Sequence, residues 1–250
     1  MASSNHKILK LKDKTDNNVI DKGNGIDNLG ARMLICGKSG LGKTNLLANM
    51  LLLPCWYAND LHADDIWIFS GSLKGDAKMQ TIIEQKGIPE GNCFEDFDDS
   101  ILKDIYDVCV DEFEERTKQN KKIYHKLIIL DDLSFSGVLK EKQASQINRV
   151  FCNGRKFSIS IIVTSQKYTQ ISTVQRANFT SAILYNCSNS QLDAIEQDCN
   201  YMKDKKSFKK MFRDVCPDKR DFICINFSND KEYLYLDKNF EKIDYKKYET

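Results

Sequence analysis

Residues 33–47 have the sequence Met33-Leu-Ile-Cys-Gly-Lys-Ser-Gly-Leu-Gly-Lys-Thr-Asn-Leu-Leu47. The first four residues are apolar and predict a strand, Gly37 to Thr44 fits the pattern G-x-x-x-x-G-K-[ST], and residues 45–53 predict a helix. With ordinary glycine usage, the bare pattern should arise by chance in on the order of one per cent of chains this long. The order of strand, glycine loop and helix lowers that figure further and favours a phosphate-binding loop.

The loop has the residue types needed to hold a nucleoside triphosphate with Mg²⁺. Its glycines let backbone N–H groups turn toward an anion, and the helix that follows adds a partial positive charge at its N-terminus. Lys43 is expected to reach the β- and γ-phosphates, and the Thr44 hydroxyl is expected to hold Mg²⁺. The residues that we expect to contact the nucleotide are Gly37, Lys38, Ser39, Gly40, Leu41, Gly42, Lys43, Thr44 and Asn45.

Length and charge set outer limits on function. The chain has 250 residues and a formal net charge of +1, so it can form one α/β domain but is not a polycation that coats nucleic acid. We expect a polar lead-in over residues 1–30 and one domain over residues 31–250. The nine cysteines contain no C-x-x-C pair, which disfavours a zinc site or a disulfide framework. The absence of an apolar leader or an 18-residue apolar run predicts an intracellular protein without a membrane span.

Apolar runs alternate with helical patterns along the chain, which predicts a mainly parallel α/β sheet in three layers. A helix over residues 100–116 is predicted to begin at a Ser100 cap and to bury Ile101, Ile105, Val108 and Phe113. The alternation over residues 221–237 predicts a C-terminal β-hairpin. The other predicted strands are residues 7–11, 65–70, 124–132, 157–166 and 181–186, and the other helices are residues 79–86, 141–153, 188–200 and 207–215.

Three polar side chains follow buried strands and are candidates for chemistry at the phosphate. Asp131 ends the run Leu127-Ile-Ile-Leu130, as expected of the carboxylate that holds Mg²⁺ in such sites. Asp132 suits a general base that polarises the attacking water, although a turn or cap role is also open. Gln166 ends the next strand, where its amide could donate to a phosphate and accept from water. Its alternative is an ordinary polar residue at a strand end.

Two arginines are candidates for a catalytic role in a neighbouring subunit. Arg155 precedes the strand over residues 157–166 and would lie at its N-terminal edge, far from its own nucleotide. An arginine there can stabilise the transferring phosphoryl group of a neighbour. Arg176 is a rival candidate, and either arginine could instead be a surface ion-pair residue.

These motifs together resemble the FtsK/HerA superfamily, and more narrowly the genome-packaging ATPases of poxviruses, giant viruses, virophages and Polinton-type elements. The resemblance covers roughly residues 32 to 186. Its most specific feature is the double Asp followed by a strand that ends in Gln. The matching segments, in the family's order, are residues 37–44, 127–132, 153–155, 158–166 and 176–178.

The resemblance implies a RecA-like P-loop core with an additional strand, and a ring of five or six subunits that hydrolyses ATP to drive double-stranded DNA into a capsid. It implies Lys43 and Thr44 at the phosphates and Mg²⁺, Asp131 at the metal, Asp132 as base, Gln166 as sensor and Arg155 as the finger acting in trans. Many members have Glu where Asp132 stands. Capsid or portal-vertex proteins are the implied partners, and the host cytoplasm, a virus factory or the virion is the implied location.

Other classes of protein remain open alternatives. A P-loop kinase acting on a small molecule would need an arginine-rich lid, and no arginine cluster is present. A signalling GTPase would need an N-K-x-D run, which is also missing, and a scaffold without turnover would not need the intact acidic pair. The lysines near residues 118–122 and 203–210 could line a DNA channel, but a solvated helix face is the favoured interpretation.

Overall fold

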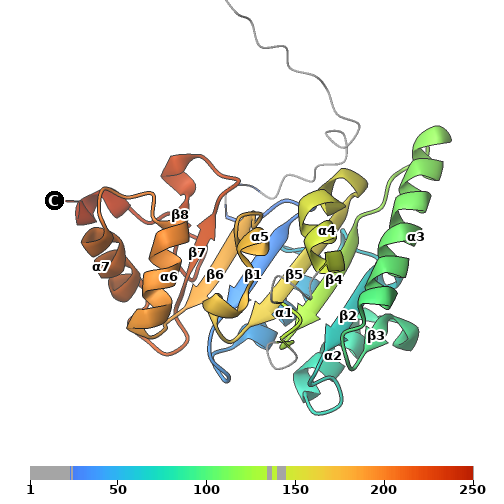
Figure 1. Ribbon diagram of the computed structural model, residues 1–250, viewed down its shortest axis with the longest axis horizontal. Coiled ribbons are helices and arrows are strands. Elements are labelled where there is room, and N and C mark those ends of the chain that lie inside the picture. The colour runs from blue at the N-terminus through green and yellow to red at the C-terminus, as the bar shows by residue number, and fades with distance from the viewer. Residues whose placement is uncertain (1–22, 24, 134–136, 140–144, 250) are drawn as a thin grey trace, which may run out of the picture.

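A computed structural model describes residues 23, 25–133, 137–139 and 145–249. In these residues the chain forms an eight-stranded sheet in the order β3-β2-β4-β5-β1-β6-β7-β8, which crosses the molecule in Figure 1. The strands are β1 (Arg32–Cys36), β2 (Ile66–Ser70), β3 (Cys93–Phe94), β4 (Lys126–Asp131), β5 (Ile159–Ser165), β6 (Ser181–Tyr185), β7 (Phe222–Asn226) and β8 (Tyr235–Leu236). The helices are α1 (Lys43–Leu52), α2 (Ala77–Lys86), α3 (Asp99–Lys118), α4 (Ser145–Asn153), α5 (Thr173–Arg176), α6 (Asn189–Cys199) and α7 (Lys205–Val215).

The sheet is the middle of three layers, because its strands are apolar on both faces. In β4, Ile128 and Leu130 join the core beneath α3, α4, α6 and α7, while Leu127 and Ile129 join the core on the side of α1 and α2. Figure 1 shows α3, α4, α6 and α7 in front of the sheet and α1 behind it. Strands covered on both faces read as continuous apolar runs, which is why the sequence revealed them. The expected three-layer α/β class is confirmed.

The order of the strands brings the candidate site together. Strand β5 pairs in parallel with β1 on one side and with β4 on the other. The additional strand therefore lies between the strand that leads into the glycine loop and the strand that ends at Asp131. Ligands of parallel α/β sheets lie beyond the carboxyl ends of the strands, and all three strands end at this edge.

Helix α3 differs in detail from the sequence prediction, whereas α2 ends where it was predicted to end. Helix α3 is capped by Asp98, whose carboxylate accepts from the backbone N–H groups of Ser100 and Ile101, so the expected Ser100 cap is wrong. Asp98 caps the helix in place of Ser100 because its carboxylate oxygen can accept from two free backbone N–H groups at once. The buried face is formed by Leu102, Ile105, Tyr106 and Cys109, and the Val108 side chain is 62% exposed. By contrast, the predicted end of α2 at residue 86 is confirmed, and Gly87 follows it in the left-handed conformation.

The C-terminal hairpin is present, but its second strand is short. β7 pairs antiparallel with β6, and β8 pairs antiparallel with β7 over two residue pairs. Residues 231–233 form a 3-10 turn, so the second strand, predicted over residues 232–237, begins only at Tyr235. The strand expected at residues 7–11 lies outside the described residues, as do residues 141–144 of the helix predicted to begin at residue 141.

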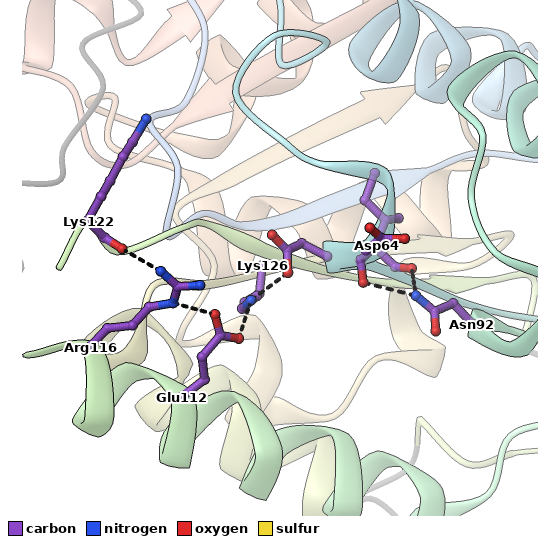
Figure 2. A network of polar contacts seen from close by, with 8 residues as sticks. Asp64, Asn92, Glu112, Arg116, Lys122 and Lys126 are labelled. Carbon is purple, nitrogen blue, oxygen red and sulfur yellow. Dashed lines mark hydrogen bonds and ion pairs between the residues drawn. The ribbon is translucent and has the colours of Figure 1, made fainter.

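A partly buried ion-pair network, with Lys126 at its buried centre, joins β4 to α3 at the sheet edge opposite the glycine loop (Figure 2). The Lys126 ammonium lies 2.5 Å from Asp65 and 2.6 Å from Glu112, and Glu112 also accepts from Arg116 at 2.6 Å. Burial, the largest influence, lowers the pKa of Lys126, but the hydrogen bonds to both carboxylates outweigh it and raise the pKa overall. Burial likewise raises the pKa of Glu112, and its bonds to Lys126 and Arg116 bring it below the ordinary 4.5.

Replacing Lys126 by Met should destabilise the protein by about 3 kcal/mol, because two carboxylates lose their shared cation in a largely buried place. Urea unfolding measures the loss, and exposed Lys121→Met is the matched control, expected to change stability by less than about 0.5 kcal/mol. The network's contribution is present above pH 4.5 and is lost as the pH falls through the lowered pKa of Glu112. Lys126→Met should therefore flatten the acid limb of the stability curve, and an unchanged limb would contradict this account.

Candidate nucleotide-binding site

The glycine loop between β1 and α1 adopts conformations that its glycines make accessible. Gly40 and Gly42 have φ angles of 76° and 112°, in the left-handed region that side chains disfavour. At Gly37 the constraint is space, because a Cβ atom there would lie 2.7 Å from Cβ of Tyr185. The Gly37 N–H donates to the Ser165 carbonyl at 3.0 Å, which fixes the start of the loop to the end of β5. The loop is therefore held by both strands that flank β1.

Lys43 and Thr44, the side chains expected to contact phosphate and Mg²⁺, both form polar contacts in the structure. The Lys43 ammonium donates to the Gly37 carbonyl at 2.8 Å and contacts the Lys38 carbonyl at 3.4 Å, so its charge lies inside the curve of the loop. The Thr44 hydroxyl donates to Oδ2 of Asp76 at 3.3 Å. Both groups are at the first turn of α1, whose N-terminal N–H groups and dipole favour an anion.

Asp131 is a buried carboxylate held by one hydroxyl from each neighbouring strand. Ser70 at the end of β2 donates to its Oδ2 at 3.0 Å, and Thr164 of β5 donates to its Oδ1 at 2.6 Å. Burial raises the pKa of Asp131, the two hydroxyls oppose that rise, and the charges of Asp132 and Asp76 add to it. A cation beside this group would relieve the accumulated negative charge.

Asp132 leaves the strand in a left-handed conformation and meets Gln166. Its φ is 48°, a region in which Asp is one of the better tolerated residues, and its N–H donates to Thr164 Oγ1 at 3.1 Å. The Gln166 amide donates to its two carboxylate oxygens at 2.9 Å and 3.1 Å. The expected base and the expected sensor are thus in direct contact, although they are 34 residues apart in sequence.

A cavity of about 570 Å³ lies between the loop, α2 and the end of β4. Lys43, Thr44, Asp131 and Asp132 all line it, so the structure brings the predicted phosphate, metal and base residues together. Ser39, Gly40, Gly42 and Asn45 of the predicted set also line it. Gly37, Lys38 and Gln166 line a neighbouring cavity of about 370 Å³ instead, and the Leu41 side chain is buried in the core.

Six residues that line the cavity were not predicted from the sequence: Ser72, Gly75, Asp76, Ala77, Lys78 and Arg220. Asp76 caps α2, and Arg220 precedes β7 and is exposed. Asp76 follows the carboxyl end of a predicted strand, which is a positional signal that could have selected it. Arg220 reaches the cavity only because β7 runs antiparallel to β6 and so begins at the loop's edge of the sheet. No local pattern carries that information.

Arg155 lies at the opposite edge of the sheet from this cavity. It is exposed in the turn before β5, and seven residues of extended strand separate that turn from Gln166, a span of roughly 20 Å. It shares a cavity of about 420 Å³ with Arg32 and Asp27. Among the described residues no carboxylate forms an ion pair with Arg155. Its distance from its own nucleotide cavity agrees with the prediction from sequence.

Arg176, the rival candidate, is engaged within its own subunit. Its guanidinium donates to Asp198 at 2.6 Å and lies 5.3 Å from the ring centroid of Tyr168, and its side chain is 19% exposed. The Tyr168 hydroxyl donates to the same Asp198 oxygen at 2.9 Å. The arrangement joins α5 to α6 and leaves Arg176 poorly placed to reach another subunit.

The family described as poxvirus A32 protein matches residues 92–250 of this chain. The chain belongs to the poxvirus A32 protein family. The match begins after the glycine loop and includes Asp131, Asp132, Arg155 and Gln166, so family and loop are independent observations. Comparison with curated protein sequences gives no significant match.

Solved structures with the same fold include two of the genome-packaging NTPase B204. B204 from Sulfolobus turreted icosahedral virus has a TM-score of 0.55 at 13% identity, over 79% of this chain and 93% of that one. B204 from Sulfolobus turreted icosahedral virus 2 has a TM-score of 0.54 at 14% identity, over 79% and 92%. EssC ATPases 2 and 3 from Geobacillus thermodenitrificans match with a TM-score of 0.52 at 16% identity, over 70% and 36%.

The family and the fold together confirm the resemblance that the motifs indicated. This A32 family member is an ATPase of the viral genome-packaging type, and it has the α/β fold of the B204 and EssC structures. No helix in the described part of the chain is both long and apolar enough to cross a bilayer.

Proposed function

We propose that this A32 family ATPase is an ATP-driven translocase that moves viral double-stranded DNA into a capsid as a homo-oligomeric ring. The observation that carries the proposal is the separation of functional groups on β5. Gln166 meets Asp132 beyond one end of this strand, and exposed Arg155 precedes the other. A head-to-tail ring is an arrangement in which the arginine edge of one subunit can meet the nucleotide cavity of the next. The solved structures of the genome-packaging NTPase B204 in complex with AMP, AMPPCP and ATP-gammaS agree with a nucleotide-driven role.

The residues of the cavity fit Mg²⁺ as well as ATP. The Thr44 hydroxyl and the Asp131 carboxylate are oxygen donors of the kind that Mg²⁺ prefers, and the buried charge of Asp131 lacks a cationic partner among the described residues. Thr44 and Asp131 would hold the ion, directly or through its water shell. When bound there, Mg²⁺ would supply positive charge that offsets the negative charge developing on the phosphates.

The protein's own groups then divide the work of hydrolysis. Lys43 donates to the β- and γ-phosphates, and the loop N–H groups surround the remaining oxygens. The Asp132 carboxylate accepts a proton as water forms its bond to the γ-phosphorus, and the bond from phosphorus to the β–γ bridging oxygen breaks. Gln166 orients Asp132 and senses the phosphate through its amide. Arg155 of the neighbouring subunit stabilises the transferring phosphoryl group in trans.

The implied partners are duplex DNA and capsid or portal-vertex proteins. We place the working complex at capsids that are being filled in the host cell, in the cytoplasm or in a virus factory. A small-molecule phosphotransferase remains the alternative, and it makes a different product: a phosphorylated acceptor instead of free phosphate.

Duplex DNA should stimulate phosphate release from ATP at least about tenfold over the basal rate, because translocases couple turnover to their track. Phosphate release and oligomer mass should be measured in the same samples, with Lys43→Ala as the blank. DNA-dependent assembly with stimulated turnover supports the proposal. Unstimulated turnover in a sample that remains monomeric with DNA would contradict it, and phosphorylation of a nucleoside or other small acceptor would favour the alternative.

A further inference from the structure

Asp76 has two separate contacts, one from each carboxylate oxygen. Its Oδ1 caps α2 by accepting from the N–H groups of Lys78 at 2.9 Å and Met79 at 3.3 Å. Its Oδ2 faces the nucleotide cavity and accepts from the Thr44 hydroxyl at 3.3 Å. An ordinary cap uses one side-chain oxygen, so capping alone leaves the second contact unexplained.

The second contact concerns the hydroxyl that is expected to hold Mg²⁺. A hydroxyl that ligates a metal through an oxygen lone pair must direct its proton to another acceptor, and Oδ2 of Asp76 is that acceptor here. At 3.3 Å the bond is longer than the usual range for two oxygens, so the bond itself stabilises little. The full negative charge that Asp76 brings to the cavity is the larger effect.

That charge has no cationic partner in the described part of the chain. Lys43, Lys78 and Arg220 also line the cavity, but none forms an ion pair with Asp76. Lys43 is directed toward the carbonyls of its own loop. Asp76 therefore adds to the field at Asp131 and makes the cavity more attractive to a divalent cation.

We propose that Asp76 is a positioning residue of the metal site, which orients the Thr44 hydroxyl and adds a third carboxylate charge beside Asp131 and Asp132. The inference rests on the proposed Mg²⁺-dependent function. Asp76 acts through Thr44 and through the metal's water shell, while its other oxygen holds the first turn of α2. The loop from β2 to α2 thereby becomes part of the nucleotide site.

Asp76→Asn separates the charge from the cap, because Asn caps helices about as well as Asp. Binding of Mn²⁺, a spectroscopic substitute for Mg²⁺, should be measured by electron paramagnetic resonance on the full chain with ADP and without DNA. The substitution should weaken Mn²⁺ binding about 10- to 100-fold, as expected for a residue beside the ligands, and should leave the Tm within ~2 °C. Asp76→Ala should weaken Mn²⁺ equally and also lower the Tm by ~3 °C.

Asp98→Asn is the matched control. Asp98 caps α3 as Asp76 caps α2, by accepting hydrogen bonds from two backbone N–H groups, but it does not line the cavity. It should leave Mn²⁺ binding unchanged. Wild-type Mn²⁺ affinity in Asp76→Asn would overturn the inference and reduce Asp76 to a helix cap. If the wild-type chain itself bound no Mn²⁺ in the presence of ADP, the proposed function would fail first, so the two failures are distinguishable.

Discussion

Lys43→Ala should weaken ATP binding by about a hundredfold or more and lower phosphate release by at least about 10²-fold to 10³-fold. The ammonium lies inside the loop on the carbonyls of Gly37 and Lys38, at the place where a triphosphate would replace those contacts by charge-assisted hydrogen bonds. Alanine removes the charge and these donors together. A fluorescent ATP analogue measures the binding, and a phosphate sensor measures the turnover.

Lys38→Ala is the matched control for this prediction. Lys38 lies in the same loop and carries the same charge, but it is exposed and lines the neighbouring cavity. Its removal should change ATP binding less than about threefold, since an exposed charge is screened by solvent and salt. Equal losses in the two variants would show that the loop's total charge matters, not the position of one ammonium, and would contradict the assignment of Lys43.

The parts of the site that sequence could predict are those that local patterns define. The phosphate-binding loop could be recognised because its strand, glycines and helix are contiguous in the sequence. Asp131 could be recognised because it ends a run of apolar residues. The placement of Gln166 at the same edge of the sheet as the loop followed from one added rule, that parallel strands end at the same edge, but its direct contact with Asp132 was not predicted. All three depend on short stretches of chain and on a rule about sheets.

The parts that sequence missed depend on pairings between distant segments. Arg220 reaches the cavity through the antiparallel placement of β7, and Asp76 through the path of a loop after β2. The exposure of Val108, which was predicted to be buried, has a different cause. When a helix carries apolar residues on more than one side, its sequence does not identify which face is buried. Here the face was decided by which residues α4 and the sheet could cover.

The choice between Arg155 and Arg176 is the clearest case in which structure adds to sequence. Each arginine lies in a polar segment next to a predicted strand, so the sequence alone did not decide which of them acts in a neighbouring subunit. Arg176 is bound to Asp198 and lies against Tyr168, whereas Arg155 forms no ion pair with any described residue and is exposed. A finger must be free to enter another subunit's site. The contacts therefore favour Arg155, and they predict different consequences for the two substitutions.

Arg155→Ala should lower DNA-stimulated turnover by about 10³-fold, within the range seen when an arginine finger is removed. Asp132→Asn should lower it to a similar extent by removing the base. When the two variants are mixed before assembly, some sites pair an intact Asp132 with an intact Arg155 from the neighbour. If the sites act independently and the subunits mix at random, an equimolar mixture should regain about a quarter of the wild-type rate.

Arg176→Ala tests whether this rescue is specific. Because its ion pair lies within one subunit, the substitution should lower the Tm, and mixing it with Asp132→Asn should give no more than the sum of the separate rates. Mass measurement must show mixed rings in every sample, since failure to assemble would imitate failure to rescue. Mixed rings of Arg155→Ala and Asp132→Asn that stay inactive would remove Arg155 from the trans site. Rescue in such rings requires two subunits to build one site, because neither variant alone supplies both groups.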